Sequence, residues 1–296
     1  MDVDVVTVAY RSERHLRSCV EPLAGAPGIR VFVVNNDCPN RSADTVRDLP
    51  VAVVEMGRNA GFGAGSNAGA KAGSAPAILF LNPDGEMQPD QVLALADAFE
   101  RDPAVGAVGP HILETDGTTQ LSMRRTPRLR SAFAEAFFLN NLLPGASWTS
   151  EIVADGYEQA REVEWLSGAV LCARRSAFEQ LGGFDERFFL YSEDIDLCTR
   201  LRLAGYRLRY EPGPIARHAG GGSAPRPGQV ALKAEARITY ARLHEARPRY
   251  AAFRAAFVLN ELLRLPLAAT RSRGHLRGRL AALAVTLRHR STAAVA

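Results

Sequence analysis

The chain has 296 residues, 47% hydrophobic and 23% charged, which excludes a disordered or fibrous protein and suits one α/β domain with a C-terminal extension. Its net charge of +4 is unevenly distributed, because residues 226–296 hold fourteen Lys and Arg against three Glu. The N-terminus lacks a basic segment followed by an apolar one, the four cysteines are scattered and no apolar run reaches about 18 residues, so we expect a cytoplasmic protein without disulfides or a transmembrane helix.

The first hundred residues alternate between apolar, β-branched runs and segments compatible with helices. We predict strands at 3–9, 31–34, 51–55 and 77–81, and helices between them at 13–23, 44–47 and 65–72. Strands that are apolar throughout and spaced one helix apart indicate a parallel sheet with helices on both faces. Because ligands of such sheets lie at the carboxyl ends of the strands, the residues directly after each run are the candidates for a binding site.

A glycine-rich segment, residues 57–69, follows the third strand. Glycines let the backbone approach a ligand, and the N-terminus of the next helix attracts phosphate, so this segment is a candidate nucleotide-binding loop. No frame satisfies GxGxxG, since the last position is Ser66 when counted from Gly61 and Ala68 when counted from Gly63. GxxxxGK[ST] is also missing, which excludes a P-loop and disfavours a nicotinamide-dependent oxidoreductase.

Asp84 directly follows the fourth strand. Pro83 cannot continue a central strand and Gly85 permits a sharp turn, so the carboxylate is presented at the carboxyl edge of the sheet. A carboxylate in this place suits a hard divalent cation, which keeps several waters and is completed by substrate phosphates. Turn formation or capping of the next helix is the alternative use of this residue.

The pattern then predicts a helix at 89–101, a short strand at 105–108 and a long excursion at the sheet edge over 115–163. The remaining predicted elements are a strand at 164–173, helices at 175–181 and 193–204, and a last strand at 206–210. We expect residues 1–225 to form the catalytic domain and residues 226–296 a basic helical extension. Long loops in compact domains are usually functional, so the Arg- and Phe-rich part at 121–138 is a candidate for substrate contact.

The acidic run Glu193-Asp194-Ile195-Asp196 opens a predicted helix directly after an aromatic run that ends at Tyr191. The positive end of the helix dipole favours ionised carboxylates, which is the state that a general base requires. Aromatic surface beside an acid suits a sugar ring, whose C–H face is apolar while its hydroxyls need acceptors. Plain helix capping is the alternative for these acids. His218, after the last strand, is either a metal ligand beside Asp84 or a surface residue.

Over residues 3–223 these motifs resemble glycosyltransferase family 2, which has the GT-A fold, and within it the rhamnosyltransferase-like branch of cell-wall and polysaccharide synthesis. The most specific string begins at Trp165-Leu166-Ser167-Gly168 and continues through Gly182-Gly183-Phe184-Asp185-Glu186 to Glu193-Asp194-Ile195-Asp196. The resemblance implies an inverting transfer of rhamnose or a similar hexose from a dTDP- or UDP-sugar to a hydroxyl of a glycan, free or polyprenyl-linked. It also implies Mg²⁺ or Mn²⁺ as cofactor.

The resemblance also assigns residues to roles. It implies a donor site made of Ala9, Tyr10, Asn36, Asn59, Gly61, Phe62, Gly63, Asn67, Asn82 and Asp84. Asp84 and His218 would hold the metal, and Asp194, with Glu193 beside it, would act as catalytic base. We expect acceptor contacts from Trp165, Ser167, Gly168 and Tyr191. The sequence departs from the family at Asn35-Asn36, where an acid is usual, and at Asn82, the first acid of the family's metal motif; these departures leave donor identity and metal affinity open.

Two other functions share some of these features. A sugar nucleotidyltransferase has a similar sheet and metal acid, but it usually carries a Gly-rich, Lys/Arg-containing loop directly after the first strand, and Ala9-Tyr10-Arg11-Ser12 is not such a loop. A nucleic-acid-binding protein is supported only by the basic tail, and an acidic cleft repels phosphate unless a metal intervenes, so no nucleic-acid partner is expected.

The basic tail allows two predictions. Helical spacing gathers apolar residues on one face, with polar residues and two phenylalanines on the other, so we predict that the apolar stripe packs against the catalytic domain. This stripe consists of Ala252, Ala255, Ala256, Leu259, Leu262 and Leu263. The alternative is that the tail rests on an anionic membrane surface and brings the enzyme to a polyprenyl-linked acceptor. The sequence is also compatible with a homodimer.

Overall fold

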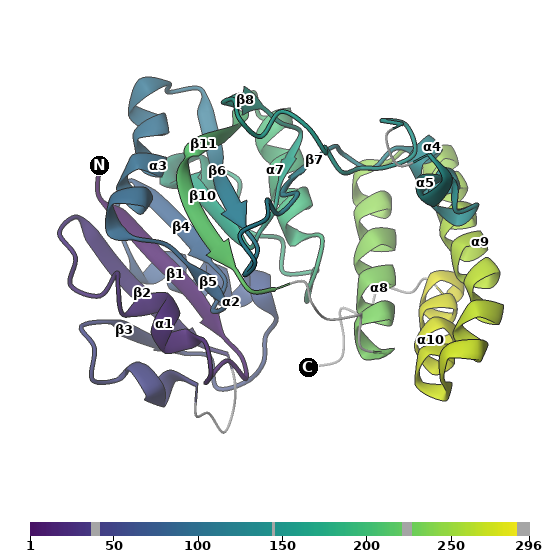
Figure 1. The fold of residues 1–296 in the computed structure, drawn as a ribbon, viewed down its shortest axis with the longest axis horizontal. Helices are drawn as coiled ribbons and strands as arrows, with labels where there is room; N and C mark the ends of the chain where they lie inside the picture. The colour runs from purple at the N-terminus through teal and green to yellow at the C-terminus, as the bar shows by residue number, and fades with distance from the viewer. Residues whose placement is uncertain (37–41, 144–145, 221–226, 289–296) are drawn as a thin grey trace. The chain divides into compact units, whose positions relative to one another are not determined.

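The computed structural model describes residues 1–36, 42–143, 146–220 and 227–288 (Figure 1). The chain divides into two compact units. A sheet-containing unit comprises Met1–Arg124, Asp155–Glu186 and Asp194–Gly220, and a helical unit comprises Arg125–Ala154, Arg187–Glu193 and Gly221–Ala296. The predicted catalytic domain of residues 1–225 therefore contributes two of its segments to the unit that contains the C-terminal helices.

Four parallel strands form one half of the sheet, as the alternating pattern predicts. They are β1 (Val3–Ala9), β2 (Ile29–Asn35), β3 (Ala52–Glu55) and β4 (Ala77–Leu81), which lie in the order β3-β2-β1-β4. All seven residues of β1 are buried, because helices cover both faces of the sheet. The carboxyl ends of β2, β1 and β4 consequently lie side by side at one edge.

The other half of the sheet contains antiparallel pairs. β10 (Val170–Arg174) runs antiparallel between β4 and β6 (Val105–Leu113), and β6 pairs in parallel with β11 (Arg207–His218). β5 (Gly85–Glu86) and β8 (Arg161–Glu162) pair with β11. The predicted mostly parallel α/β fold is confirmed. The antiparallel strands were not predicted, because an apolar run does not reveal the direction of a strand.

Three strands differ by more than two residues from their predicted bounds, and one of them is β6, which continues to Leu113 and does not end at 108. The predicted strand at 164–173 is broken into β9 (Trp165–Leu166), which pairs with β7 (Met123–Arg124), and β10. The last strand does not stop at 210 but continues to His218, with its pairing to β6 interrupted by a bulge between Glu211 and Ile215. This extension matters because it carries His218 to the same sheet edge as Asp84.

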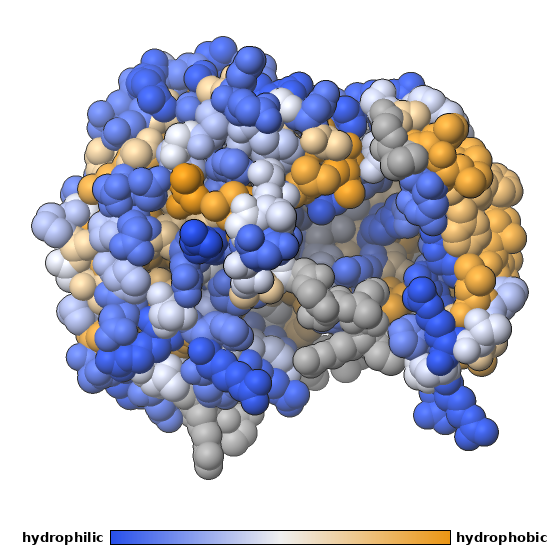
Figure 2. All heavy atoms as spheres, in the orientation of Figure 1, coloured by the Kyte–Doolittle hydropathy of each residue, from blue (hydrophilic) through white to orange (hydrophobic). Residues whose placement is uncertain are grey.

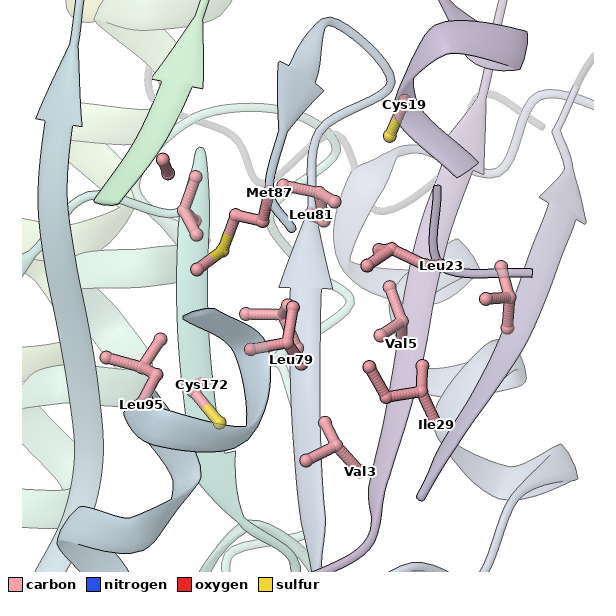
Figure 3. Packing of buried hydrophobic residues seen from close by; sticks show 14 of the residues in the cluster. Val3, Val5, Cys19, Leu23, Ile29, Leu79, Leu81, Met87, Leu95 and Cys172 are labelled. Atoms are coloured by element: carbon pink, nitrogen blue, oxygen red, sulfur yellow. The ribbon is translucent and has the colours of Figure 1, made fainter. Parts of the chain in front are cut away.

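The helices of the sheet-containing unit are short. They are α1 (Leu16–Val20), a 3-10 helix at Ala43–Val46, α2 (Phe62–Ala72), α3 (Pro89–Arg101), α6 (Arg175–Gln180) and α7 (Glu193–Leu203). Figure 3 shows how strand residues such as Val5 and Leu79 pack with Leu95 of α3 in the core. On α2, a side chain at Gly65 would lie 2.9 Å from Val8, so glycine lets this helix lie directly on β1.

Buried charges and thiols complete this unit. The Asp4 carboxylate, fully buried in β1, accepts hydrogen bonds from Arg175 (2.7 Å), Arg30 (2.9 Å) and the Ala75 amide (2.7 Å). Such pairing offsets the large cost of burying a carboxylate. The cysteines at 19, 172 and 198 are buried and free, and position 38 lies outside the described residues.

The helical unit consists of α4 (Leu129–Ala136), α5 (Leu139–Leu142), α8 (Pro227–His244), α9 (Arg247–Arg271) and α10 (Arg273–Arg288). The excursion predicted over 115–163 thus supplies two helices to it. No helix among the described residues is long and apolar enough to cross a bilayer.

The predicted packing face of the tail helix is only partly buried. On α9 the buried residues include Phe253, Phe257, Asn260 and Glu261, whereas Leu262 and Leu263 are 46% and 38% exposed. The polar face is buried because arginines of the same unit neutralise its carboxylates; Arg279 donates two hydrogen bonds of 3.0 Å to Glu261. Of the predicted apolar stripe Ala256 is buried, whereas its two last leucines are left exposed.

Candidate active site

The ends of the parallel strands bring the predicted donor residues together. The Asn36 amide, just after β2, donates to the Ala9 carbonyl at the end of β1 (3.0 Å). Tyr10 follows and is 42% exposed, with the Arg11 guanidinium 5.3 Å from its ring centroid. Exposed aromatic surface at the carboxyl edge of a parallel sheet suits a planar ligand such as a nucleobase.

The Asn36 side chain holds the glycine-rich loop. Its Nδ2 donates to Asn59 Oδ1 and to the Gly61 carbonyl, both at 3.1 Å, and its Oδ1 accepts from the Ala60 amide at 2.9 Å. The residue is only 2% exposed. Asn36, which we predicted to be a donor ligand, therefore uses its side-chain amide to shape the glycine-rich loop.

This loop leads directly into a helix N-terminus. Gly61 has φ +89°, a conformation that favours glycine, and α2 begins at the next residue, Phe62. The ring of Phe62 packs edge-on against Phe184 at 5.9 Å. Gly63, in the first turn, is buried. Free backbone amides at such a helix start attract a phosphate group.

Asn67 has a role that the sequence did not reveal. Its Oδ1 accepts from the Phe184 amide (2.8 Å), while its Nδ2 donates to the Phe184 carbonyl (2.9 Å) and to Glu186 (3.0 Å). Asn67 therefore fastens the 182–186 string to α2. The same string is held on its other side by Arg200, which donates to the carbonyls of Leu181 and Gly183 and pairs with Asp196.

Asp84 and His218 meet at the edge formed by β4, β5 and β11. Their Oδ1 and Nε2 atoms are 3.3 Å apart, and Asn82 Nδ2 lies 3.4 Å from the same Nε2. Burial by itself raises the pKa of Asp84, but the imidazole of His218 and a backbone hydrogen bond outweigh it, so the pKa lies below the ordinary value for a carboxyl group. Asp84 is therefore ionised at neutral pH.

Gln120 orients the imidazole. Its Nε2 donates to Glu114 (2.8 Å) and to the Gly220 carbonyl (3.2 Å), which turns its Oε1 toward His218 Nδ1 at 3.1 Å. Nδ1 then carries a proton, and in the neutral imidazole this tautomer leaves Nε2 able to bind a metal ion beside Asp84. No sequence pattern indicated Gln120, because this residue lies in a segment without periodic spacing.

This arrangement fits a divalent cation. Asp84 Oδ1 and His218 Nε2 are 3.3 Å apart, and a carboxylate oxygen and the Nε2 of a neutral imidazole are both atoms that can bind a divalent cation. A side chain at Gly220 would come within 2.9 Å of Asp84 Oδ2, so glycine keeps this position open. Among the described residues no group of three or more His, Cys, Asp or Glu could hold a metal. Diphosphate and water would have to supply the other ligands, as is usual for Mg²⁺.

Asp194 lies in the first turn of α7, and two amides hold its carboxylate. Gly168 N–H donates to Oδ2 (2.9 Å) and Ile195 N–H to Oδ1 (2.8 Å). Burial raises the pKa of Asp194 above its ordinary value, and these hydrogen bonds oppose that rise. A carboxylate with a raised pKa and a fixed direction is suited to accept a proton.

The two key carboxylates occupy the same edge of the sheet. The Asn82 amide donates to the Ala169 carbonyl (2.9 Å), and the preceding Gly168 contacts Asp194. Asp84 is two residues from Asn82. The break between β9 and β10 thus joins the predicted metal ligand to the predicted base.

The candidate acceptor residues lie in both units of the chain and have different neighbours. The Arg124 guanidinium lies 5.2 Å from the Trp165 ring centroid, and Ser167 Oγ accepts from the Ala169 amide at 3.4 Å. Within the helical unit, Tyr191 has φ +71° and its ring centroid lies 4.9 Å from Lys233 Nζ. Glu193, the first residue of α7, is buried. A non-glycine residue held at positive φ is a strained feature of the kind found at functional sites.

Comparisons with known proteins agree with this geometry. The sequence model of glycosyl transferase family 2 matches residues 4–153, and that of the N-terminal domain of galactosyltransferase matches residues 150–219. The chain is 36% identical over 254 residues to an N-acetylglucosaminyl-diphospho-decaprenol L-rhamnosyltransferase of Mycobacterium tuberculosis, covering 80% of this chain and 82% of the relative. The chain belongs to glycosyltransferase family 2.

Further proteins are similar to this glycosyltransferase in sequence or in fold. The rhamnosyltransferase WbbL of Escherichia coli is 37% identical over 145 residues, which cover 48% of this chain and 51% of WbbL. The solved mannosyltransferase PcManGT of Pyrobaculum calidifontis, in complex with GDP-Man and Mn²⁺, has 17% identity, a TM-score of 0.58 and coverage of 96% and 86% of the two chains. Staphylococcus aureus TarS with UDP-GlcNAc has a TM-score of 0.53 at 14% identity, covering 97% and 92%. Both structures share the fold.

Proposed function

We propose that this glycosyltransferase moves rhamnose or a similar hexose, with inversion, from a dTDP- or UDP-sugar to a hydroxyl of a polyprenyl-linked glycan in cell-envelope synthesis. The name of the mycobacterial relative, which describes a decaprenol-linked acceptor and a rhamnosyl group, supports this choice. The observation that carries the proposal is the Asp194 carboxylate, fixed by two amides at the edge that also holds Asp84.

The chain's own residues can perform the proton transfer. Asp194 accepts the proton of the acceptor hydroxyl as that oxygen bonds to the anomeric carbon. The bond from this carbon to the diphosphate breaks on the opposite side, and its electron pair leaves with the diphosphate. A single displacement of this kind inverts the anomeric configuration. The amides of Gly168 and Ile195 keep the carboxylate aimed throughout.

Asp84 and His218 are the residues that would hold the metal, with Gln120 fixing the imidazole. Mg²⁺ or Mn²⁺, when bound, neutralises the diphosphate and makes it a better leaving group. The glycine-rich loop held by Asn36 and the N-terminus of α2 would receive the donor. Because the Asn36 amide already bonds to that loop, base selection would depend on other groups, with exposed Tyr10 as the stacking surface.

The proposed site of action is the cytoplasmic face of the membrane, where a polyprenyl-linked acceptor would be reached. The strongly basic tail supports a peripheral contact with anionic lipid. Homodimerisation stays a prediction, which light scattering of the full chain can test.

Replacing the base tests the proposed reaction. With a panel of nucleotide sugars, Mn²⁺ and a lipid-linked acceptor, Asp194→Asn should lower kcat by about 10²–10⁴-fold, the usual contribution of a general base. Donor binding, measured by calorimetry, should be retained because Asp194 does not hold the donor. Asp97→Asn, at a carboxylate that is 53% exposed, is the matched control and should transfer at the wild-type rate. Near wild-type transfer by Asp194→Asn would refute the assignment.

A further inference from the structure

The helical unit contains a cavity of about 400 Å³ that the transfer reaction does not use. It lies among α5, α8, α9 and α10, and it has a basic lining. The charged or titratable residues among the described part of its lining are Arg264, Arg271, His275 and Arg279, and no Asp or Glu accompanies them. A cavity of this volume with three guanidinium groups has the size and charge to accept a phosphorylated group.

The arginines are only partly neutralised by the protein. Arg279 pairs with Glu261, but Arg264 donates to Asn260 and to the Glu135 carbonyl and has no ion-pair partner among the described residues. Burial lowers the pKa of Arg264, while the neighbouring charges act in both directions, Glu135 and Glu261 opposing the shift and Arg279 and Arg237 adding to it. Exposed Arg271 likewise has no ion pair in the described structure.

One leucine lines the same cavity, and others are exposed on the helices α5 and α9. Leu267 lines it and is 55% exposed; Leu262 and Leu263 on α9 are 46% and 38% exposed, and Leu142 on α5 is 72% exposed. Figure 2 shows apolar side chains gathered over α9. Exposed leucines would not contribute to the binding of a small anion from solution. Apolar side chains next to arginines are characteristic of a helix face that lies in a membrane interface.

The net positive charge along these helices is complementary to the negative charge of an anionic bilayer. Residues 247–288, which span α9 and α10, contain nine Arg and one Glu. The cytoplasmic leaflet attracts such segments, by an amount of the order of fivefold in affinity for each basic residue near the surface.

We propose that this cavity binds the phosphoryl headgroup of an anionic phospholipid while the leucines around it enter the bilayer surface. The proposal rests on the proposed function only in that the acceptor is carried by a membrane. Arg264 and Arg271 supply the charge and the N–H donors to the phosphoryl oxygens, Arg279 adds its charge while paired with Glu261, and Leu267 enters the acyl boundary.

Vesicle flotation of the full chain, without nucleotide sugar, tests the proposal. The probe is phosphatidylcholine with or without phosphatidylglycerol. We expect binding only with phosphatidylglycerol, and a loss of about fivefold or more in the partition coefficient for Arg271→Gln. Arg247→Gln, at the opposite end of α9 and away from the cavity, removes the same charge and should cost less. Equal losses for both variants would show only diffuse attraction and overturn the pocket.

Two further measurements separate this proposal from others. Leu267→Ala should weaken vesicle binding by about tenfold, whereas Leu203→Ala, at a side chain 78% exposed on α7, should not. The proposal would also be overturned if inorganic diphosphate, at a concentration equal to that of the lipid phosphate, displaced the protein from the vesicles. It would likewise be overturned if the protein formed a dimer and this dimer did not bind the vesicles. The Arg271→Gln variant should transfer sugar to a detergent-dispersed acceptor at the wild-type rate. This assay contains no vesicles, so it tests the proposed reaction independently of lipid binding.

Discussion

The contact between Gly168 and Asp194 allows a quantitative prediction about pH. A methyl group at position 168 would lie 3.1 Å from Asp194 Cβ and 3.4 Å from its Oδ2. The carboxylate must then move away by a few tenths of an ångström, which weakens the 2.9 Å hydrogen bond from the Gly168 amide. Gly168→Ala therefore perturbs the proposed base, Asp194, through this hydrogen bond and leaves its carboxylate in place.

The magnitude follows from the strength of that bond. A hydrogen bond to a charged group is worth about 1.5–3 kcal/mol, and one pKa unit corresponds to about 1.4 kcal/mol. Complete loss would raise the pKa of Asp194 by about one to two units, so weakening it should raise the pKa by about one unit. The bond stabilises the ionised form, which fixes the sign. The base works when deprotonated, so activity falls as pH decreases through this pKa, and the acid limb should move to higher pH.

The assay is kcat against pH at saturating donor and acceptor, since this profile reports groups in the bound complex. Gly213→Ala is the matched control, because a side chain there meets nothing within 4 Å. It should keep the wild-type profile. An acid limb that stays in place in Gly168→Ala, with activity lowered equally at every pH, would refute the view that this amide sets the proton affinity of Asp194.

Three other substitutions probe the supports of the site. Gln120→Ala should raise the Mn²⁺ concentration for half-maximal activity by about 10-fold or more, because His218 loses its orienting partner; an unchanged metal titration would contradict that role. Asn67→Ala should lower the free energy of unfolding in urea by about 1–3 kcal/mol, since buried partners lose their hydrogen bonds, while circular dichroism checks that the fold is kept. Arg175→Ala leaves Asp4 buried with one partner fewer and should cost about 3–5 kcal/mol, which thermal melting measures; a loss below 1 kcal/mol would contradict the importance of this pair.

Much of the site could be predicted from local sequence. Each parallel strand is an apolar run, and the residues after it, such as Ala9, Asn36 and Asp84, must lie at the carboxyl edge wherever the strands pair. The string from Trp165 to Asp196 is specific enough to predict the family. The acids that open α7 were predicted from their place at a helix start.

Other features depend on contacts between distant residues, which no local pattern contains. Gln120 reaches His218 across 98 positions, and Asn67 holds Phe184 across 117. Both asparagines, Asn36 and Asn67, were predicted as donor ligands, and their side-chain hydrogen bonds hold the glycine-rich loop and the 182–186 string. An amide side chain can serve a ligand or a loop equally well, and its partners decide which.

The tail helix shows most clearly where sequence alone is insufficient. Helical periodicity sorted α9 into an apolar and a polar face, as it must, because the period is a local property. Which face is buried depends on what the neighbouring helices offer. Here Arg237 and Arg279 neutralise Glu135 and Glu261, so the polar face is covered and the leucines remain exposed. The sequence by itself determined the order of the elements and the chemistry at the strand ends, while tertiary pairing of charges decided the interior of the helical unit and the surface that it presents.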